Sequence, residues 1–298
     1  MTGAIVDVPG VLTGHWTGAR TGVTVLLFPP GSVGAAELRG GAPATREVAV
    51  LEPGRTVEAV DAILLTGGSA FGLAAADGVM AWLAERDRGF PTRAGPVPIV
   101  PAAAIFDLVE SEGARPGPAE GRAAADAATS DPPHTGRVGA GRGATVGKWR
   151  GPEHATAGGL GSASAQVDAA TVGAIAVVNA CGDVVDRDGA VLAGSRAGPD
   201  AVWFPDPEPF DPEPNTTLAV VATDARLTKG ECWLLAQSAQ HGIVHAVHPS
   251  HTRHDGDLAI AVATGAVDAN LDRLRVAATE VVAAAVRDAV SGDDDGGS

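Results

Sequence analysis

Two adjacent threonines, Thr216 and Thr217, begin an apolar stretch directly after a proline-rich segment. Threonine at the start of a strand is ordinarily explained by β-propensity alone. Two features indicate chemistry instead. Segment 205–214 repeats Asp-Pro and Glu-Pro pairs, which favour exposed backbone that can be cut with little loss of stability. Asn215 tolerates unusual backbone angles, so strain could be stored in the peptide bond ahead of the Thr216 hydroxyl. The local sequence leaves both interpretations open.

A second cluster of functional side chains combines five histidines with two aspartates: His241, His245, His248, His251, His254, Asp255 and Asp257. Such side chains bind transition metals, and His241 and His245 have the i, i+4 spacing of two ligands on one helix face. Gly242 and the β-branched residues that follow it predict that the helix has already ended there. We therefore expect a polar surface loop and no metal site.

The glycine-rich run 136–148 ends in Lys148, as a phosphate-binding loop does. Its spacing does not fit that motif. Arg142 stands where the first glycine belongs, and Trp149 stands where a serine or threonine belongs. Lys148 therefore needs another explanation than nucleotide binding.

The composition of the 298-residue chain limits its partners. Its 21 lysines and arginines against 36 aspartates and glutamates give a net charge of −15, which argues against nucleic acid and anionic membranes. The two cysteines form neither a Cys-x-x-Cys pair nor a disulfide framework. We find no signal-peptide pattern and no run of about 18 apolar residues. These features predict a soluble, cytoplasmic protein.

Short apolar strands alternate with alanine-rich helices, which predicts an α/β protein. Strands are expected at 23–28, 62–65, 171–179, 215–224 and 258–263, and helices at 69–86, 119–130, 228–242 and 271–291. Gly68 and Ser69 lie in the turn after the second of these strands. Their N–H groups could bind an anion, or Ser69 could simply cap the next helix. Residues 292–298 are expected to form a disordered acidic tail.

Eight segments spread over nearly the whole chain form a specific pattern: GVTVL at 22–26, TGGSAFGL at 66–73, VPIVP at 97–101, IFDL at 105–108, ATVGK at 144–148, VN at 178–179, NTTLAVVATD at 215–224 and HDGD at 254–257. Together they resemble the self-processing peptidase family of L-aminopeptidase/D-esterase, the β-aminopeptidases and the nylon-oligomer hydrolases. The resemblance implies one catalytic domain over 1–298. Its fold would be a layered α/β/β/α sandwich similar to N-terminal-nucleophile hydrolases, assembled as a homotetramer.

The resemblance also implies that the chain is made as an inactive precursor that cuts itself. The bond between Asn215 and Thr216 is then the cleavage site, and the products are chains 1–215 and 216–298. Segment 199–215 would be the processing linker. After cleavage, the α-amino group of Thr216 can serve as the base for its own hydroxyl, since such amines titrate near ~8.

Other residues of the pattern take roles by the same resemblance. Lys148 would lower the proton affinity of nearby groups or bond to Thr216. Asn179, at a strand end, carries an amide that can stabilise an oxyanion. Asp255 and Asp257 would orient Lys148 and the new ammonium group.

Gly68 and Ser69 are expected to contact substrate, and the resemblance implies no cofactor. The chain has no tyrosine, whereas some aminopeptidases of this family use a tyrosine hydroxyl near the nucleophile. The eight segments together still predict an aminopeptidase-like hydrolase of small peptides or linear amides. The alternatives are a hydrolase of ω-amino-acid oligomers, an acyltransferase, and a scaffold that binds metabolites without turnover.

Overall fold

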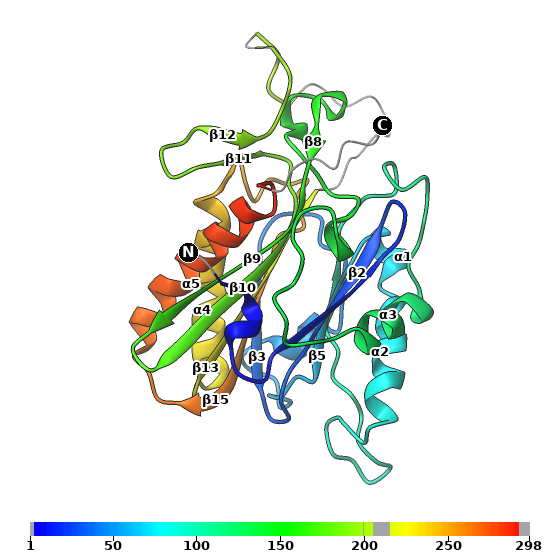
Figure 1. Ribbon diagram of the computed structural model, residues 1–298, viewed down its shortest axis with the longest axis vertical. Helices are drawn as coiled ribbons and strands as arrows, with labels where there is room; N and C mark the ends of the chain where they lie inside the picture. Colours follow the sequence, from blue (N-terminus) through cyan, green and yellow to red (C-terminus); the bar gives the residue numbers. More distant parts are fainter. Residues whose placement is uncertain (1–2, 199, 205–214, 292–298) are drawn as a thin grey trace.

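Two five-stranded sheets lie face to face at the centre of the protein. They are seen in a computed structural model that describes residues 3–198, 200–204 and 215–291 (Figure 1). The first sheet has the order β1 (Leu12–Thr17), β2 (Gly22–Leu27), β5 (Ala62–Thr66), β6 (Ala102–Ala104) and β4 (Thr45–Arg46). The second has the order β3 (Val33–Leu38), β15 (Leu258–Val267), β13 (Thr216–Ala225), β10 (Ala170–Asn179) and β9 (Gly159–Val167).

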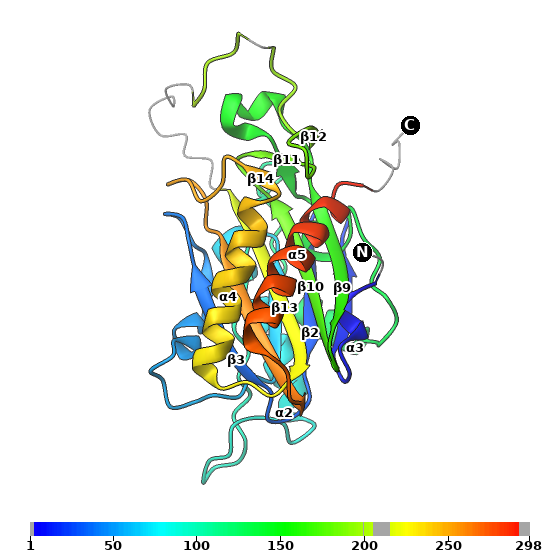
Figure 2. The ribbon, with the colours of Figure 1, turned by 90° about the vertical axis from the view of Figure 1, so that its left-hand side faces the viewer.

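Helices cover the outer face of each sheet. On the first sheet they are α2 (Ala75–Ala84) and α3 (Pro118–Asp126), and on the second α4 (Lys229–Val244) and α5 (Leu271–Asp288) (Figure 2). The expected α/β/β/α sandwich is confirmed. None of the helices in the described ranges is long and apolar enough to cross a bilayer.

Smaller elements complete the described chain. Two further sheets are formed by β12 (Val191–Ala193), β11 (Asp183–Val185) and β14 (Val247–His248), and by β7 (Thr145–Val146) and β8 (Thr156–Ala157). The short helix α1 spans Ser69–Gly72. Single 3₁₀ turns lie at Ile5–Asp7, Val48–Leu51, Gly139–Gly141, Lys148–Arg150 and Pro152–His154.

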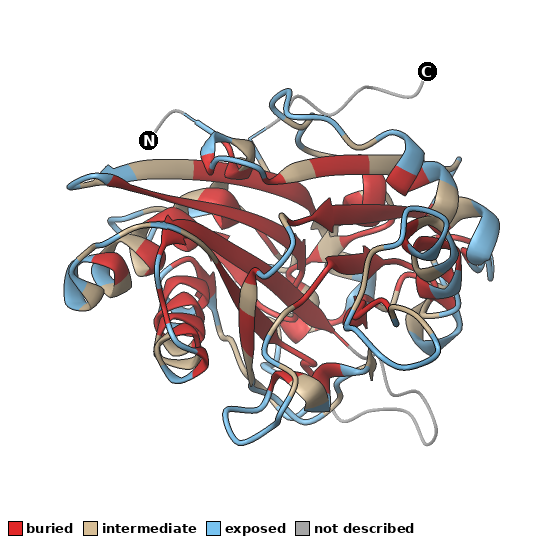
Figure 3. Ribbon diagram, turned by 90° about the horizontal axis from the view of Figure 1, so that it is seen from below, coloured by how far each residue is buried: buried red, intermediate tan, exposed pale blue. Residues whose placement is uncertain are grey.

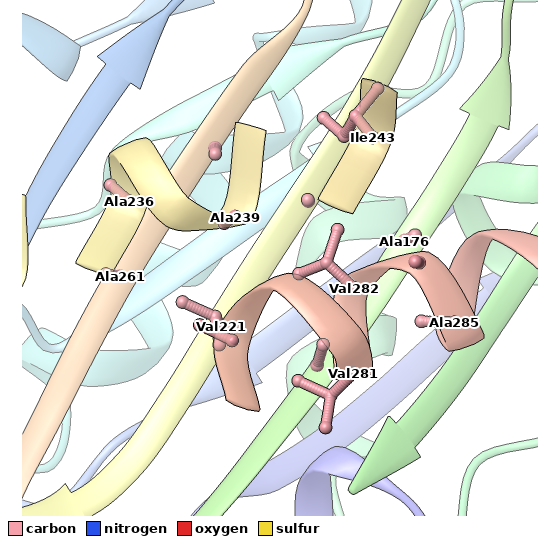
Figure 4. Packing of buried hydrophobic residues seen from close by; sticks show 14 of the residues in the cluster. Ala176, Val221, Ala236, Ala239, Ile243, Ala261, Val281, Val282 and Ala285 are labelled. Atoms are coloured by element: carbon pink, nitrogen blue, oxygen red, sulfur yellow. The ribbon is translucent and has the colours of Figure 1, made fainter. Parts of the chain in front are cut away.

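The four layers enclose three separate apolar cores, because side chains alternate between the two faces of a strand. On β13, Leu218 and Val220 point into the core between the sheets, whereas Ala219 and Val221 point toward the helices. The central strands β2, β5, β10 and β13 are buried on both faces (Figure 3). Small side chains let the helices approach the second sheet closely, as Figure 4 shows for Ala176, Val221, Ala236, Ala239, Ile243, Ala261, Val281, Val282 and Ala285.

The strand order brings three distant segments together at one end of the second sheet. Strand β13 runs antiparallel to β10 and parallel to β15. The start of β13 therefore lies beside the end of β10 and beside the chain that leads into β15. Thr216 is paired with Asn179, and Asn215 forms a bridge with Asp255. Because Thr216 has the same parity as Leu218, its side chain lies on the face between the sheets.

The expected strands are confirmed, but the bounds of the predicted helices were wrong in detail. The helix expected over 69–86 is divided into α1 and α2, and its N-cap is Gly68 rather than Ser69. Ser69 itself has a φ of 53° and makes no capping bond with its side chain. Helix α3 ends at Asp126 rather than near residue 130, since Thr129 exchanges two backbone hydrogen bonds with Thr13 of β1.

Helix α4 begins as predicted and ends later than predicted. Thr228 and Glu231 form the expected capping box, with the Thr228 N–H donating to Glu231 Oε2 at 2.8 Å. Gly242 does not end the helix, which continues to Val244. This glycine is instead needed for close helix packing, because a Cβ there would lie 2.5 Å from the carbonyl oxygen of Thr279 in α5.

Candidate active site

The Thr216 hydroxyl lies directly against the peptide bond that precedes it. Thr216 is 2% exposed, and its Oγ1 donates to the carbonyl oxygen of Asn215 at 2.5 Å. The same oxygen accepts the backbone N–H of Gly256 at 2.7 Å. Two donors therefore polarise this carbonyl. Asn215 itself forms a parallel β-bridge with Asp255.

Asn179 lies opposite Thr216 and is completely buried. Its Oδ1 accepts Lys148 Nζ and the Thr145 N–H, both at 3.0 Å. Lysine and a backbone amide can only donate, which fixes the orientation of the Asn179 amide. Its Nδ2 donates to the carbonyl oxygen of Phe106 at 3.0 Å. Lys148 Nζ also donates to Thr145 Oγ1 at 3.1 Å, so Lys148 and Thr145 together orient Asn179.

The two aspartates lie on the other side of Thr216 and are each 1% exposed. Asp257 Oδ1 accepts the N–H of Thr217 at 2.6 Å. Asp255 accepts the N–H of Thr252 at 2.8 Å and that of Cys181 at 3.3 Å. Burial, together with the charge of Asp257, raises the pKa of Asp255 to about 6. The two carboxylates therefore lie beside the start of β13, where backbone N–H groups donate to both of them.

The expected substrate-binding residues bond to segment 105–107, and the Phe106 carbonyl of that segment accepts the Asn179 amide. Gly68 N–H donates to Asp107 Oδ1 at 2.6 Å, and Ser69 N–H donates to the carbonyl oxygen of Ile105 at 2.9 Å. These amides are thus used within the fold rather than aimed at an anion. Burial raises the pKa of Asp107. Substrate contact by Gly68 and Ser69 stays a prediction.

The structure adds residues that sequence analysis did not assign. Thr145, Gly256 and Phe106 each bond to the Asn179 amide or to the Asn215 carbonyl, and all three lie within the segments that carry the family resemblance. His251, from the histidine cluster, bonds to Asp257. Within residues 3–198, 200–204 and 215–291, no three His, Cys, Asp or Glu side chains are placed to hold a metal ion.

Cys181 lies beside this site, but its thiol is not suited to act as a nucleophile. It is buried, and desolvation together with the charge of Asp255 raises its pKa to about 12. Burial raises the pKa of Cys232 to about 12 as well. We therefore expect iodoacetamide at pH 8 to leave both thiols of the folded protein unmodified and to modify both in urea. Rapid labelling of Cys181 in the folded protein, measured by mass spectrometry, would contradict this assignment.

The sequence profile of peptidase family S58 matches residues 3–294. The chain belongs to this family. The resemblance inferred from the sequence is thereby confirmed, and this S58 chain is an enzyme of the peptidase and amidohydrolase class.

Curated relatives extend over most of this S58 chain. An uncharacterized aminopeptidase of Mycobacterium leprae is 44% identical, and the match covers 89% of this chain and 80% of that protein. A 6-aminohexanoate-oligomer endohydrolase of Agromyces sp. is 31% identical, with coverage of 88% and 75%.

Solved structures show the same fold. A Burkholderia β-aminopeptidase matches with a TM-score of 0.73 and 24% identity, over 96% of this chain and 85% of the other. The L-aminopeptidase D-Ala-esterase/amidase of Ochrobactrum anthropi, described as a variant of the Ntn-hydrolase fold, matches with a TM-score of 0.71 and 20% identity over the same shares.

Proposed function

We propose that the chain cuts itself between Asn215 and Thr216, and that Thr216 is then the N-terminal nucleophile of an aminopeptidase-like amidohydrolase. The contact between the Thr216 hydroxyl and the Asn215 carbonyl carries the proposal. The S58 family membership supports it.

Self-cleavage follows from the groups around this bond. Thr216 Oγ attacks the carbonyl carbon of Asn215, while the Gly256 N–H stabilises the negative charge that develops on the oxygen. The peptide C–N bond breaks, and the nitrogen takes up the proton that the hydroxyl has lost, so that it becomes the α-amine of Thr216. The upstream chain is now an ester on Oγ. Water hydrolyses this ester, which releases the carboxylate of Asn215 and frees the threonine.

Turnover repeats this chemistry on a substrate. The α-amine of Thr216 takes the hydroxyl proton as Oγ attacks the substrate carbonyl. Asn179 has two amide hydrogens, and one already bonds to Phe106, so the second is available for the oxyanion. Lys148 keeps the amide in that orientation. The amine leaves with the proton from the α-amino group, and water then hydrolyses the acyl ester on Thr216.

We infer that the substrates are small peptides or linear amides, and the name aminopeptidase given to the 44% identical relatives supports this. The second candidate is the hydrolysis of ω-amino-acid oligomers. The endohydrolases of 6-aminohexanoate oligomers that are 31% identical favour it. Acyl transfer would need a second acceptor site. A non-catalytic scaffold would not need Thr216, Asn179 and the two aspartates to be buried together, with Lys148 bonded to Asn179.

A hydrolysis screen distinguishes these substrates. Purified enzyme is incubated with amino-acid amides, β-peptides and 6-aminohexanoate oligomers, and released amines are measured by mass spectrometry. Thr216→Ala protein prepared in the same way is the control. We expect turnover of at least one class by the wild type and none by the variant. Equal rates in both samples, or no turnover of any class, would contradict the proposed function.

We further propose that the processed enzyme is a homo-oligomer, a tetramer of cut units. The family resemblance supports this assembly. Light scattering of the same purified sample measures the mass of the particle, and a particle with the mass of one chain would contradict it.

A further inference from the structure

His251 is joined to the site by two hydrogen bonds to one carboxylate oxygen. Its ring Nδ1 lies 2.8 Å from Asp257 Oδ2, and its backbone N–H donates to the same oxygen at 3.2 Å. A carboxylate can only accept here, so Nδ1 carries the proton. The other oxygen, Asp257 Oδ1, accepts the N–H of Thr217, the residue after the proposed nucleophile.

The backbone of His251 is held in an uncommon conformation. Its φ is 56°, in the left-handed region that few residues other than glycine, asparagine, aspartate and histidine adopt. At such positions successive N–H groups converge and form an anion-binding concavity. Here the N–H of His251 donates to Asp257, and the next one, of Thr252, donates to Asp255. The strained residue therefore bonds to one of the two buried carboxylates and directs the next amide to the other.

We propose that His251 is a positioning residue for the nucleophile. It holds Asp257 in the orientation that fixes the Thr217 amide, and in this way it fixes Thr216 at the start of β13. The inference rests on the proposed function, because it gives His251 a role only through Thr216. The hydrogen bonds of His251 reach the site through Asp257 Oδ2.

Three substitutions at His251 distinguish the effect of its side-chain N–H donor from the effect of its left-handed backbone conformation. His251→Asn keeps an N–H donor near the position of Nδ1 and tolerates the left-handed conformation. This substitution removes no second side-chain hydrogen bond, since His251 Nε2 has no hydrogen-bond partner among the described residues. The aspartate of His251→Asp has nearly the same shape as asparagine, but it places a second carboxylate against Asp257. His251→Gly keeps the backbone conformation and has no side chain.

The experiment measures the self-cleavage rate, kcat and KM of these variants, with thermal unfolding as the test of folding. We expect His251→Asn to keep kcat within about threefold of the wild type. His251→Asp and His251→Gly are expected to lose about 10- to 100-fold in kcat or in cleavage rate, as for a lost hydrogen bond to a charged group, with KM little changed. His248→Asn, at an exposed histidine of the same segment, is the control for loss of a histidine.

The inference is wrong if His251→Gly protein cuts itself and turns over substrate like the wild type. This variant adds no charge beside Asp257, so its result does not depend on whether the His251→Asp protein folds. The inference is equally wrong if His251→Asn is as slow as His251→Gly. Failure of the proposed function gives a different result: the wild type would be uncut or inactive, or Thr216→Ala would keep its activity. These two samples are measured alongside the variants, so the two failures are distinguished.

Discussion

Replacing Thr216 with alanine is expected to leave a single uncut chain that has lost its activity. Alanine has no oxygen to attack the Asn215 carbonyl, and no nucleophile remains for a substrate. Loss of a catalytic nucleophile lowers kcat by roughly 10⁴-fold or more. The expected result is therefore one chain of 298 residues by intact mass, with turnover at the level of the buffer.

Two neighbouring substitutions are the controls for this result. Thr216→Ser keeps the hydroxyl but loses the methyl group that restricts χ1, so it should cut more slowly and keep measurable activity once cut. Thr217→Ala keeps the nucleophile and the backbone N–H that bonds to Asp257, so it should still cut itself. A fragment that begins at residue 216 in Thr216→Ala protein, or turnover by that protein, would place the nucleophile elsewhere.

Asn179→Ala is expected to lower kcat of the cut enzyme by about 10²–10³-fold with little change in KM. This is the usual cost of removing one oxyanion donor. Self-cleavage should continue, because the Asn215 carbonyl is bonded by Gly256 and Thr216 rather than by the Asn179 amide. The measurement is steady-state kinetics on the cut form, with intact mass as the check on processing.

Asn179→Asp is the matched variant for this prediction. It keeps an oxygen that can accept Lys148 and Thr145, and it removes the amide hydrogens. We expect the same loss of kcat as in Asn179→Ala. An unchanged kcat in either cut variant would reject the oxyanion role. A loss in Asn179→Ala alone would mean that Asn179 acts by holding Lys148.

The layers were predictable from the sequence, because strands that are buried on both faces have a continuous apolar pattern. Strands β10 and β13 are buried at every position, and their bounds differ from the expected ones by a residue or so. Glycine was the source of the main helix error. Gly242 could be a helix end or a point of close packing, and only the position of α5 against α4 decides between them.

The site residues were predicted from the family resemblance, and the fold explains why they meet. The sequence alone did not show that β13 pairs with both β10 and β15, which is what brings Asn179 and Asp255 to Thr216. The contribution of backbone groups was also hidden from the sequence. The Gly256 N–H and the Phe106 carbonyl act through atoms that every residue carries, so their residue types gave no signal.

Two predicted segments lie partly or wholly outside the described residues. They are the acidic tail 292–298 and, within the processing linker, residue 199 and residues 205–214. The described residues of the linker are 200–204 and Asn215, and the N–H of Phe204 donates to the carbonyl oxygen of Trp149 at 2.8 Å. The linker therefore contacts the residue next to Lys148, on the site side of the molecule.

The most direct test is denaturing mass spectrometry, with N-terminal sequencing, of the active wild-type protein. Cleavage before Thr216 gives two polypeptides, residues 1–215 and 216–298, and the smaller of the two begins Thr-Thr-Leu-Ala-Val. An active preparation that consists of the single intact chain, or a smaller fragment that begins at any residue other than Thr216, would contradict it.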